Sequence, residues 1–382
     1  MSPKMEKQRV CVIMYKRVPP VFSLEYLRVF LSAIDKEGYN RKAIRTAIFN
    51  ERLKFEKEKF KAIGRGYRLK TVKSEHLVKN CYQLSNQIGL LQRINDEVLL
   101  ADESRELVTY GIANPKTKWM LLDKLFRTYI PFNEILLCIR NQPKCQVLLP
   151  LRKEKGLFKS FADKYQLRVN QIQFEVVRDL LTQLEILNWR ERKDEEKMQL
   201  VYLIATVVKL SEVQGFLSAA SKVIREENPQ LDRFLNEITE GGKLSIEKMS
   251  ANDLPKQAED KGYITIKPQE TEDFLFLKTL SVNSPIFEEI LWEEYLKISD
   301  YKSNYPVYYS ELRDDVCERL RISDKMFDSF IKRMINKPSE YTVKLHPGGG
   351  PMPPRRGLSS MLKALPPKTG SDEYITFIKA IK

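Results

Sequence analysis

Two stretches of the sequence align without a gap: Leu167-Arg-Val-Asn-Gln-Ile-Gln-Phe-Glu and Leu320-Arg-Ile-Ser-Asp-Lys-Met-Phe-Asp. Each runs from an apolar residue through Arg and a β-branched residue to a helix-capping residue, Asn170 or Ser323. The side-chain oxygen of such a residue accepts hydrogen bonds from the first free N–H groups of a helix. A Phe four residues beyond each cap is placed to pack on the residue ahead of the cap. Both stretches therefore predict a turn between two helices.

The residues around the first stretch predict helices on both sides of the turn, followed by two strands. The helical patterns cover 119–129, 132–139, 154–165 and 171–184. Two apolar segments follow, Leu187-Asn-Trp-Arg-Glu and Gln199-Leu-Val-Tyr-Leu-Ile. The tract between them, Lys193-Asp-Glu-Glu-Lys, is fully charged, which is typical of an exposed hairpin tip.

The residues around the second stretch predict the same order. Helices are expected at 286–298, at 309–320, and from Ser323 to a point before Pro338. Strand-like segments begin at Tyr341 and Tyr374. The long loop between them contains His346-Pro-Gly-Gly-Gly-Pro-Met-Pro-Pro-Arg-Arg-Gly, and a short helix is expected at 358–365.

The N-terminal part repeats this order less clearly. Helices are expected at 23–34, from 41 to about 63 with Asn40 as its cap, and at 74–86. An extended stretch follows, in which the pair Asn95-Asp96 predicts a hairpin turn.

Three helices followed by a hairpin, with a capped third helix, resemble the winged-helix fold of the helix-turn-helix superfamily. The resemblance covers residues 74–101, 145–205 and 286–382 and is one of architecture. It implies that the third helix enters the major groove of DNA and that the wing reaches the backbone or the minor groove. Some tandem winged-helix proteins bind other proteins instead, so the fold alone does not define the function.

The fold expected from this resemblance is α+β and mostly α, with tandem winged-helix domains joined by helical linkers. A basic helical or winged-helix-like domain is expected at 1–112 and a central winged helix at 113–227. Residues 228–283, which include Gly241-Gly242 and Pro255, are expected to form a linker or small subdomain. A winged helix with a long basic wing is expected at 284–382.

The composition is that of a folded chain without a membrane span. The sequence has 382 residues, of which 42% are hydrophobic and 30% are charged. Its most apolar run, Leu200 to Val208, covers about half of the roughly 20 residues that a spanning helix needs. The charged start, Met1-Ser-Pro-Lys-Met-Glu-Lys, lacks an apolar signal segment, so a cytoplasmic location is expected.

The Cys and His residues argue against disulfides and against zinc. Five Cys are scattered without a C-x-x-C pair, and the two histidines, His76 and His346, lie far apart. A reduced compartment is expected, with no cofactor and no metal ion.

The positive charge lies at the two ends of the sequence. Residues 1–80 carry a net charge of +12, residues 81–300 a net −4 and residues 301–382 a net +6, within a total of +14. Such end-loaded charge favours contact with a polyanion. The alternative is a basic tail or a solvated helix face.

The candidate DNA-binding residues are the basic residues of these two ends. Arg41 and its neighbours lie at a helix start, where the macrodipole disfavours cations, which favours an anionic partner. The pair Arg355-Arg356 lies on a Pro/Gly tract that can follow a groove, although such a pair can also serve only solubility. The full set is Arg41, Lys42, Arg45, Arg65, Arg68, Lys70, Lys73, Lys325, Lys332, Arg333, Lys344, Arg355 and Arg356.

The central domain has a different charge pattern. Its third helix offers Gln171, Gln173 and Arg178 for base contacts but also carries Glu175 and Asp179. The hairpin 190–197 has four basic and four acidic residues. This domain is expected to act mainly as a scaffold or to contact protein partners.

The sequence gives little support to catalysis. It contains neither a G-x-x-x-x-G-K-[ST] loop nor a G-x-S-x-G elbow. A metal-dependent nuclease needs an Asp followed by a strand-borne Glu-x-Lys. The one candidate set, Asp253, Glu259 and Lys261, lies in a polar stretch and is better explained by chance.

Three hypotheses follow from these observations. The first is a non-catalytic protein that binds double-stranded DNA with tandem winged helices, as prokaryotic replication, regulatory and restriction or phage-defence components do. The second is a winged-helix subunit that docks protein partners in a larger nucleic-acid-handling assembly. The third, a restriction-type nuclease, depends only on the Asp253 set.

Overall fold

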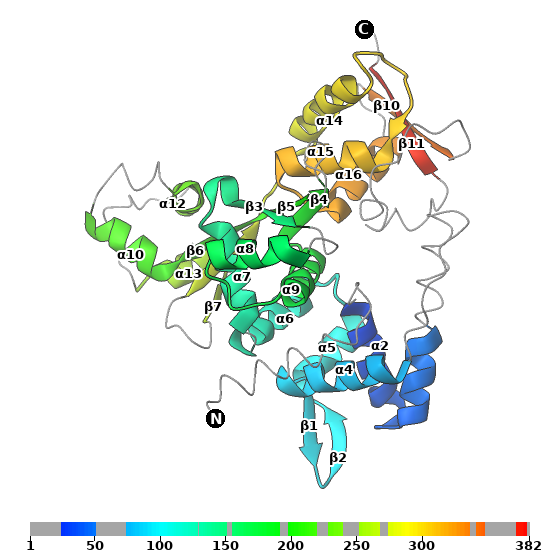
Figure 1. Cartoon of the computed structure of the whole chain (residues 1–382), viewed down its shortest axis with the longest axis vertical. Coiled ribbons are helices and arrows are strands. Elements are labelled where there is room, and N and C mark those ends of the chain that lie inside the picture. The colour runs from blue at the N-terminus through cyan, green and yellow to red at the C-terminus, as the bar shows by residue number, and fades with distance from the viewer. Residues whose placement is uncertain are drawn as a thin grey trace.

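The chain folds into an α+β structure that is mostly helical and has four small antiparallel sheets (Figure 1). We describe it from a computed structural model. The structure describes residues 24–50, 74–128, 130–150, 155–191, 198–219, 228–239, 252–267, 274–336, 341–347 and 372–379. No helix among these residues is both long enough and apolar enough to cross a membrane.

The N-terminal unit (residues 24–110) contains helices and one hairpin. Its elements are α2 (Leu24–Glu37), a helix over residues 41–50, α4 (Ser74–Gln87), β1 (Leu91–Ile94), β2 (Glu97–Leu100) and α5 (Asp102–Tyr110). The predicted turn is confirmed, since Asn95 and Asp96 both have positive φ, as a tight two-residue hairpin turn requires. Asn40 also caps as predicted, because its Oδ1 accepts hydrogen bonds from the N–H groups of Lys42 and Ala43.

The central unit (residues 115–203) has a strand that the sequence did not predict. Its elements are α6 (Pro115–Thr128), α7 (Ile130–Arg140), a 3-10 turn (Pro143–Cys145), β3 (Gln146–Pro150), α8 (Lys155–Lys164), α9 (Gln171–Gln183), β4 (Leu187–Glu191) and β5 (Met198–Leu203). The sheet order is β3-β5-β4, so the hairpin strand β5 pairs on its second edge with β3. Val201 of β5 therefore lies between Val147 and Trp189.

The C-terminal unit (residues 284–379) repeats this arrangement. Its elements are α14 (Ser284–Ile298), β9 (Val307–Tyr308), α15 (Tyr309–Leu320), α16 (Asp324–Asn336), β10 (Tyr341–Pro347) and β11 (Asp372–Lys379). The sheet order is β10-β11-β9, so again the last strand lies between the first and the second. Ile375 of β11 pairs with Leu345 and Val307, as Val201 pairs in the central unit.

The described residues between 205 and 279 form a further folded unit. Its elements are β6 (Ala205–Lys209), α10 (Leu210–Ala219), α12 (Pro229–Thr239), α13 (Leu254–Asp260), β7 (Ile264–Ile266) and β8 (Leu275–Thr279). Because β6 pairs with β8, the sheet β6-β8-β7 crosses the boundary that the sequence predicts between 227 and 228. Its own core contains Phe234, whose ring meets Tyr263 edge-on and Phe276 at a tilt. The described parts of the stretch expected as a linker or small subdomain, residues 228–239, 252–267 and 274–283, therefore contain helices, strands and core residues.

The two aligned turns share their caps but differ in length. The turn between α8 and α9 spans residues 165–170, whereas the turn between α15 and α16 spans only 321–323. Asn170 forms a capping box with Gln173, and Ser323 Oγ accepts a hydrogen bond from the N–H of Met326. The predicted caps are thus confirmed, and the helix expected at 154–165 ahead of the first turn is α8 (Lys155–Lys164).

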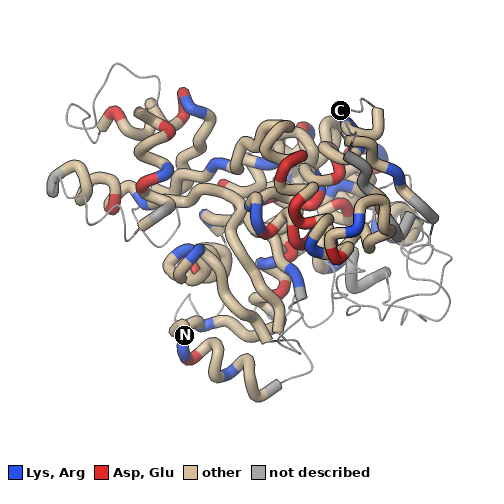
Figure 2. The backbone as a smooth tube through the Cα atoms, turned by 90° about the horizontal axis from the view of Figure 1, so that it is seen from above, with Lys and Arg blue, Asp and Glu red and all other residues tan. Residues whose placement is uncertain are grey.

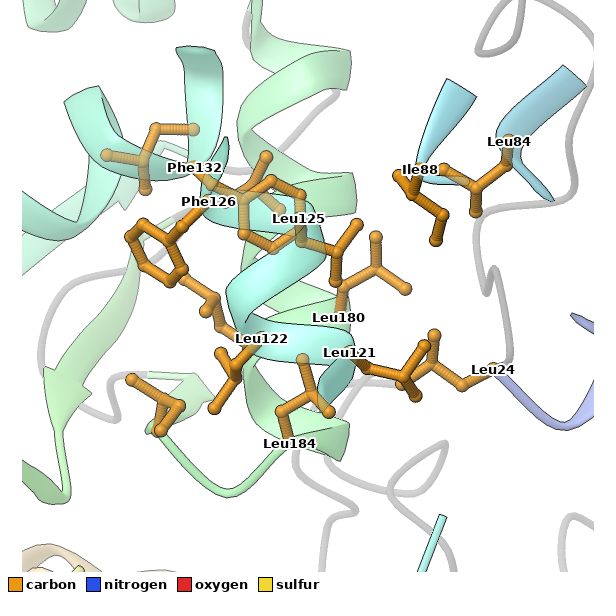
Figure 3. Packing of buried hydrophobic residues seen from close by; sticks show 14 of the residues in the cluster. Leu24, Leu84, Ile88, Leu121, Leu122, Leu125, Phe126, Phe132, Leu180 and Leu184 are labelled. Carbon is orange, nitrogen blue, oxygen red and sulfur yellow. The ribbon is translucent and has the colours of Figure 1, made fainter. Parts of the chain in front are cut away.

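The N-terminal and central units share one hydrophobic core, in which α6 is the middle element. Figure 3 shows Leu121 and Leu125 of α6 in one group with Leu180 of α9 and with Leu24 and Ile88 of the N-terminal unit. The C-terminal unit instead has a separate core around Phe287, Phe327 and Phe330. Its attachment to the rest of the chain must therefore depend on other contacts.

Candidate nucleic-acid interface

Helix α16 has one buried face and one exposed polar face. Its buried residues, Phe327, Phe330, Ile331 and Met334, recur at helical spacing and join the C-terminal core. The exposed residues of the helix are Lys325, Ser329, Lys332, Arg333, Ile335 and Asn336. Three of these six residues are basic, one is apolar and none is acidic.

The acidic residues of α16 face inward, toward a buried arginine of α15. Arg313 has no exposed surface and lies 3.8 Å from both Asp324 and Asp328. Burial would lower the pKa of Arg313, but the surrounding carboxylates more than offset burial, so this pKa is raised. Burial raises the pKa of Asp328, and Arg313 and the hydrogen bond from the Tyr309 hydroxyl, at 2.6 Å, offset this only in part. The acids of α16 therefore do not neutralise its exposed face.

The basic residues on the exposed face have no carboxylate partner among the described residues. Neither Lys325, Lys332 nor Arg333 forms an ion pair there, and the Arg333 guanidinium lies 4.6 Å from the centre of the Phe330 ring. Lys344 of β10 is also exposed, between the buried Val343 and the partly buried Leu345. The positions predicted at 325, 332, 333 and 344 thus lie on the surface of one unit with their charges available.

The charges of the C-terminal unit are separated by element. Acidic residues predominate on α14 and α15, where Lys297 and Arg319 are both paired with Glu294. In Figure 2 the acidic positions gather in the half of the molecule that carries the C-terminal end. The basic face of α16 is therefore a local feature and does not reflect a uniformly basic unit.

The β4–β5 hairpin of the central unit does not offer a free basic residue at Arg190. This side chain, on β4 of the central unit, forms ion pairs with Asp315 and Glu318 of α15. Burial lowers the pKa of Arg190, but the two carboxylates outweigh burial and raise it overall. A residue expected on an exposed hairpin thus holds two units together, while Arg192 lies outside the described residues.

A polar seam connects the central unit to the start of α16. Asn188 Nδ2 donates a hydrogen bond to Asp324 Oδ1 at 2.8 Å. The Ser323 hydroxyl donates to Glu185 Oε1 at 3.1 Å, while Glu185 Oε2 accepts from Lys118 Nζ at 2.8 Å. Because Ser323 also caps α16, the central unit contacts the residue that begins the exposed helix.

Arg321 adds the remaining contacts of this seam. Its left-handed backbone, with φ of 55°, ends α15, and its Nη2 donates to Gln146 Oε1 at 2.9 Å. The guanidinium also lies 4.8 Å from the centre of the Tyr202 ring. The short turn 321–323 is therefore held on both sides by the central sheet.

The third helix of the central unit is buried and unavailable for base contacts. Gln173 forms the capping box, and Gln171 Nε2 donates a hydrogen bond to the Pro150 carbonyl. Arg178 is 5% exposed, donates to Asp179 and stacks at 4.2 Å over Trp189. The residues that the sequence offered for base reading in this unit thus serve its packing.

The N-terminal candidates are only partly described. Arg41, Lys42 and Arg45 are exposed on the first turns of the helix over 41–50. The remaining candidates lie outside the described residues: Arg65, Arg68, Lys70, Lys73, Arg355 and Arg356.

The nuclease-like set lies on a helix. Asp253 immediately precedes α13, Glu259 is on α13 and Lys261 follows it, so no strand presents the Glu-x-Lys pair. Within the described ranges, no three His, Cys, Asp or Glu side chains lie close enough to hold a metal ion. The four described cysteines, Cys81, Cys138, Cys145 and Cys317, are unbridged.

Sequence reasoning missed the residues that organise this site. Arg313 stands with Tyr309, Leu312, Val316 and Cys317 on the buried side of α15, a face that should be apolar. An arginine at such a position is a signal that could have been found. Asn188, a polar residue inside an apolar strand segment, is a similar signal.

Comparisons with known proteins do not place the chain in a family. No model of a protein family matches it, and no curated protein sequence matches it. Among solved structures, the chain is similar to one described as the structure of restriction endonuclease FokI. The match has a TM-score of 0.29 and 12% sequence identity, and it covers 87% of this chain and 75% of that chain.

Proposed function

We propose that this chain is a non-catalytic protein that binds double-stranded DNA, with α16 as the helix that enters the major groove. The observation that carries the proposal is the outward face of α16, where Lys325, Lys332 and Arg333 have no carboxylate partner among the described residues while Asp324 and Asp328 turn inward. The matching element and sheet order of the central and C-terminal units supports winged helices in both.

The dimensions of α16 suit this role. Its 13 residues span about 20 Å, and the major groove, about 12 Å wide, admits an α-helix. The polar seam fixes the start of the helix through Ser323 and Asp324, so the exposed face is presented in one orientation. Lys and Arg on such a face would mainly contact phosphates, which position the protein without reading sequence.

The test is the salt dependence of binding to a random-sequence duplex. Each lost phosphate contact lowers the slope of log affinity against log salt by about 0.9. Lys332→Ala with Arg333→Ala should therefore weaken binding and reduce the slope by up to about 2. The matched control is Lys297→Ala with Arg319→Ala, which removes the same charge from residues already paired with Glu294. If both double variants weakened binding equally, the loss would be explained by net charge and the proposed role of α16 would be wrong.

The non-catalytic part of the proposal has its own test. The purified chain with Mg²⁺ or Mn²⁺ is expected neither to cut DNA nor to hydrolyse ATP. DNA cleavage that disappears in Asp253→Ala or Glu259→Ala would overturn this part and leave the α16 interface untouched.

The partner-docking alternative is weakened by one observation. It placed a protein partner on the central domain, but Asn188 and Arg190 of β4 in this domain are occupied by the C-terminal unit of the same chain. Part of the central domain thus forms an internal contact.

A further inference from the structure

A cluster of tyrosine and arginine side chains lies on the N-terminal unit, away from the α16 face. The rings of Tyr39 and Tyr82 have their centres 5.2 Å apart and are tilted by 56°. Arg93 Nη2 donates a hydrogen bond to the Tyr82 hydroxyl at 2.9 Å. Tyr39 and Arg93 are both exposed, so the cluster is on the surface.

Three separate segments build this cluster. Tyr39 precedes the helix over 41–50, Tyr82 lies on α4, and Arg93 lies on β1. Gly38, with φ of 65°, makes the tight turn that places Tyr39, and the N–H of Asn40 donates back to the Gly38 carbonyl. The arrangement is thus a product of the fold and not of a single flexible segment.

The cluster carries charge that the described residues do not neutralise. Arg93 forms no ion pair with a described carboxylate; the nearby acid is Asp96 of the hairpin turn. Arg41, at the start of its helix, lies close enough to lower the pKa of Tyr39, although burial of the Tyr39 ring has the larger, raising effect. Two guanidinium groups and two phenol hydroxyls therefore share one surface.

We propose that Tyr39, Arg41, Tyr82 and Arg93 form a second contact site for the phosphodiester backbone of duplex DNA. This inference rests on the proposed function and adds to it a site at the opposite end of the molecule in Figure 1, where α4 and the β1–β2 hairpin lie.

The chemistry of the four side chains fits a phosphodiester. A guanidinium has five N–H donors in a planar fork, and the bond to Tyr82 uses one of those of Arg93. The others are available for a phosphate, which the fork of arginine matches in a bidentate manner. The exposed Tyr39 ring offers a flat apolar surface for a deoxyribose. An open surface with two separated cations suits a polymer that passes across it.

The experiment uses the full chain and a random-sequence DNA duplex. Arg41→Ala with Arg93→Ala should reduce the salt slope by up to about 2 and weaken binding equally for unrelated sequences. The matched control is Lys116→Ala with Arg127→Ala, which removes the same charge from exposed residues paired with Glu106 and Asp123. This control should keep the wild-type slope.

The outcomes separate this inference from the proposed function. Suppose that the wild-type chain binds duplex DNA and that the salt slope falls in Lys332→Ala with Arg333→Ala. If the slope is then unchanged in Arg41→Ala with Arg93→Ala, the second site is wrong and the α16 interface stands. If the wild-type chain does not bind duplex DNA at low salt, both fail. Tyr82→Phe gives an independent arm, because it removes only the hydroxyl that orients Arg93 and should weaken binding less than the double variant. Unchanged binding in Tyr82→Phe would contradict the role given to that hydroxyl.

Discussion

The buried guanidinium of Arg313 sets the charge pattern of the candidate interface. It draws Asp324 and Asp328 to the inner side of α16 and leaves Lys325, Lys332 and Arg333 on the outer side. A charge buried in this way is stable only while its partners remain. The residue that shapes the surface is therefore itself fully enclosed.

Removing this charge should be costly. Arg313→Met leaves two carboxylates beside an apolar side chain, and breaking such a buried network typically costs about 3–5 kcal/mol of unfolding free energy. Urea unfolding measures the loss. Adding Asp328→Asn to Arg313→Met should recover part of it, because one unpaired charge is then removed. No recovery would mean that the loss comes from packing.

Glu185 makes the seam sensitive to acid. Burial raises the pKa of its carboxyl, but Lys118, Lys325 and the Ser323 hydroxyl together outweigh burial, so the pKa lies below its ordinary value of 4.5. The pKa of Lys118 is lowered, because burial and the nearby charge of Lys325 together outweigh the raising effect of Glu185. Two donors, Lys118 and Ser323, bind the Glu185 carboxylate, and the charge of Lys325 acts on it without a direct contact.

The resulting pH dependence has a definite sign. A carboxyl with a lowered pKa in the folded state contributes stability above its unfolded pKa, and this stability is lost as the pH falls through the folded value. The melting temperature of the wild-type chain should therefore drop below about pH 4.5, and more steeply than that of Glu185→Gln. Glu106→Gln, which alters an exposed pair with Lys116, serves as the control. Parallel curves for wild type and Glu185→Gln would exclude Glu185 as the acid-sensitive group.

At the scale of elements, two helices with aligned sequences have opposite surroundings. Asn170 and Ser323 cap α9 and α16 as predicted, because capping depends on residues within one turn. The burial of α9 depends on α6 and on the N-terminal unit, which no local pattern encodes. The capping residues therefore predicted where α9 and α16 begin, but they could not predict which of the two helices faces solvent.

The strands that were missed have related explanations. β9 has two residues and β7 has three, too few for a period-2 pattern to emerge. β3 and β6 are longer, but no local turn marks them. The partner residues of β3 lie 48 to 56 positions away in the sequence, and those of β6 lie 66 to 74 positions away. Hairpins with a local turn, such as Asn95-Asp96, were correctly predicted.

The two caps should differ in their effect on stability. Asn170→Ala removes one cap and is expected to cost about 1 kcal/mol. Ser323→Ala removes a cap and also the hydrogen bond to Glu185, so about 2 kcal/mol is expected. Urea unfolding measures the loss of unfolding free energy in each variant. Equal losses would show that the hydrogen bond from Ser323 to Glu185 adds no stability.

At the scale of the molecule, the units are joined in two different ways. The N-terminal and central units share a hydrophobic core, whereas the C-terminal unit meets the central one through ion pairs and hydrogen bonds. The distribution of charge along the sequence predicted basic ends. It could not show that Arg190 would form an ion pair within the chain. That result depends on two segments over 100 residues apart.

The polar seam predicts separate unfolding of the C-terminal unit. Its own core is smaller than the shared core, so it should unfold at lower urea concentration. Trp292 reports on it once Trp119 and Trp189 of the central unit are replaced by Phe. The fluorescence of Trp292 should change at a lower urea concentration than the one at which the far-UV circular dichroism transition is complete. Coincident transitions would show that the seam makes the units one cooperative body.

The place of β11 in its sheet has a consequence for how the chain is made. β11 lies between β9 and β10, so neither of these strands has a partner until residues 372–379 have been added. At about 5–20 residues per second, the ribosome needs roughly two to six seconds to add residues 348–379. During this interval the nascent chain presents unpaired strand edges, which are templates for pairing with other chains. Slow codons in this segment should therefore lower the yield of native protein without changing a single amino acid.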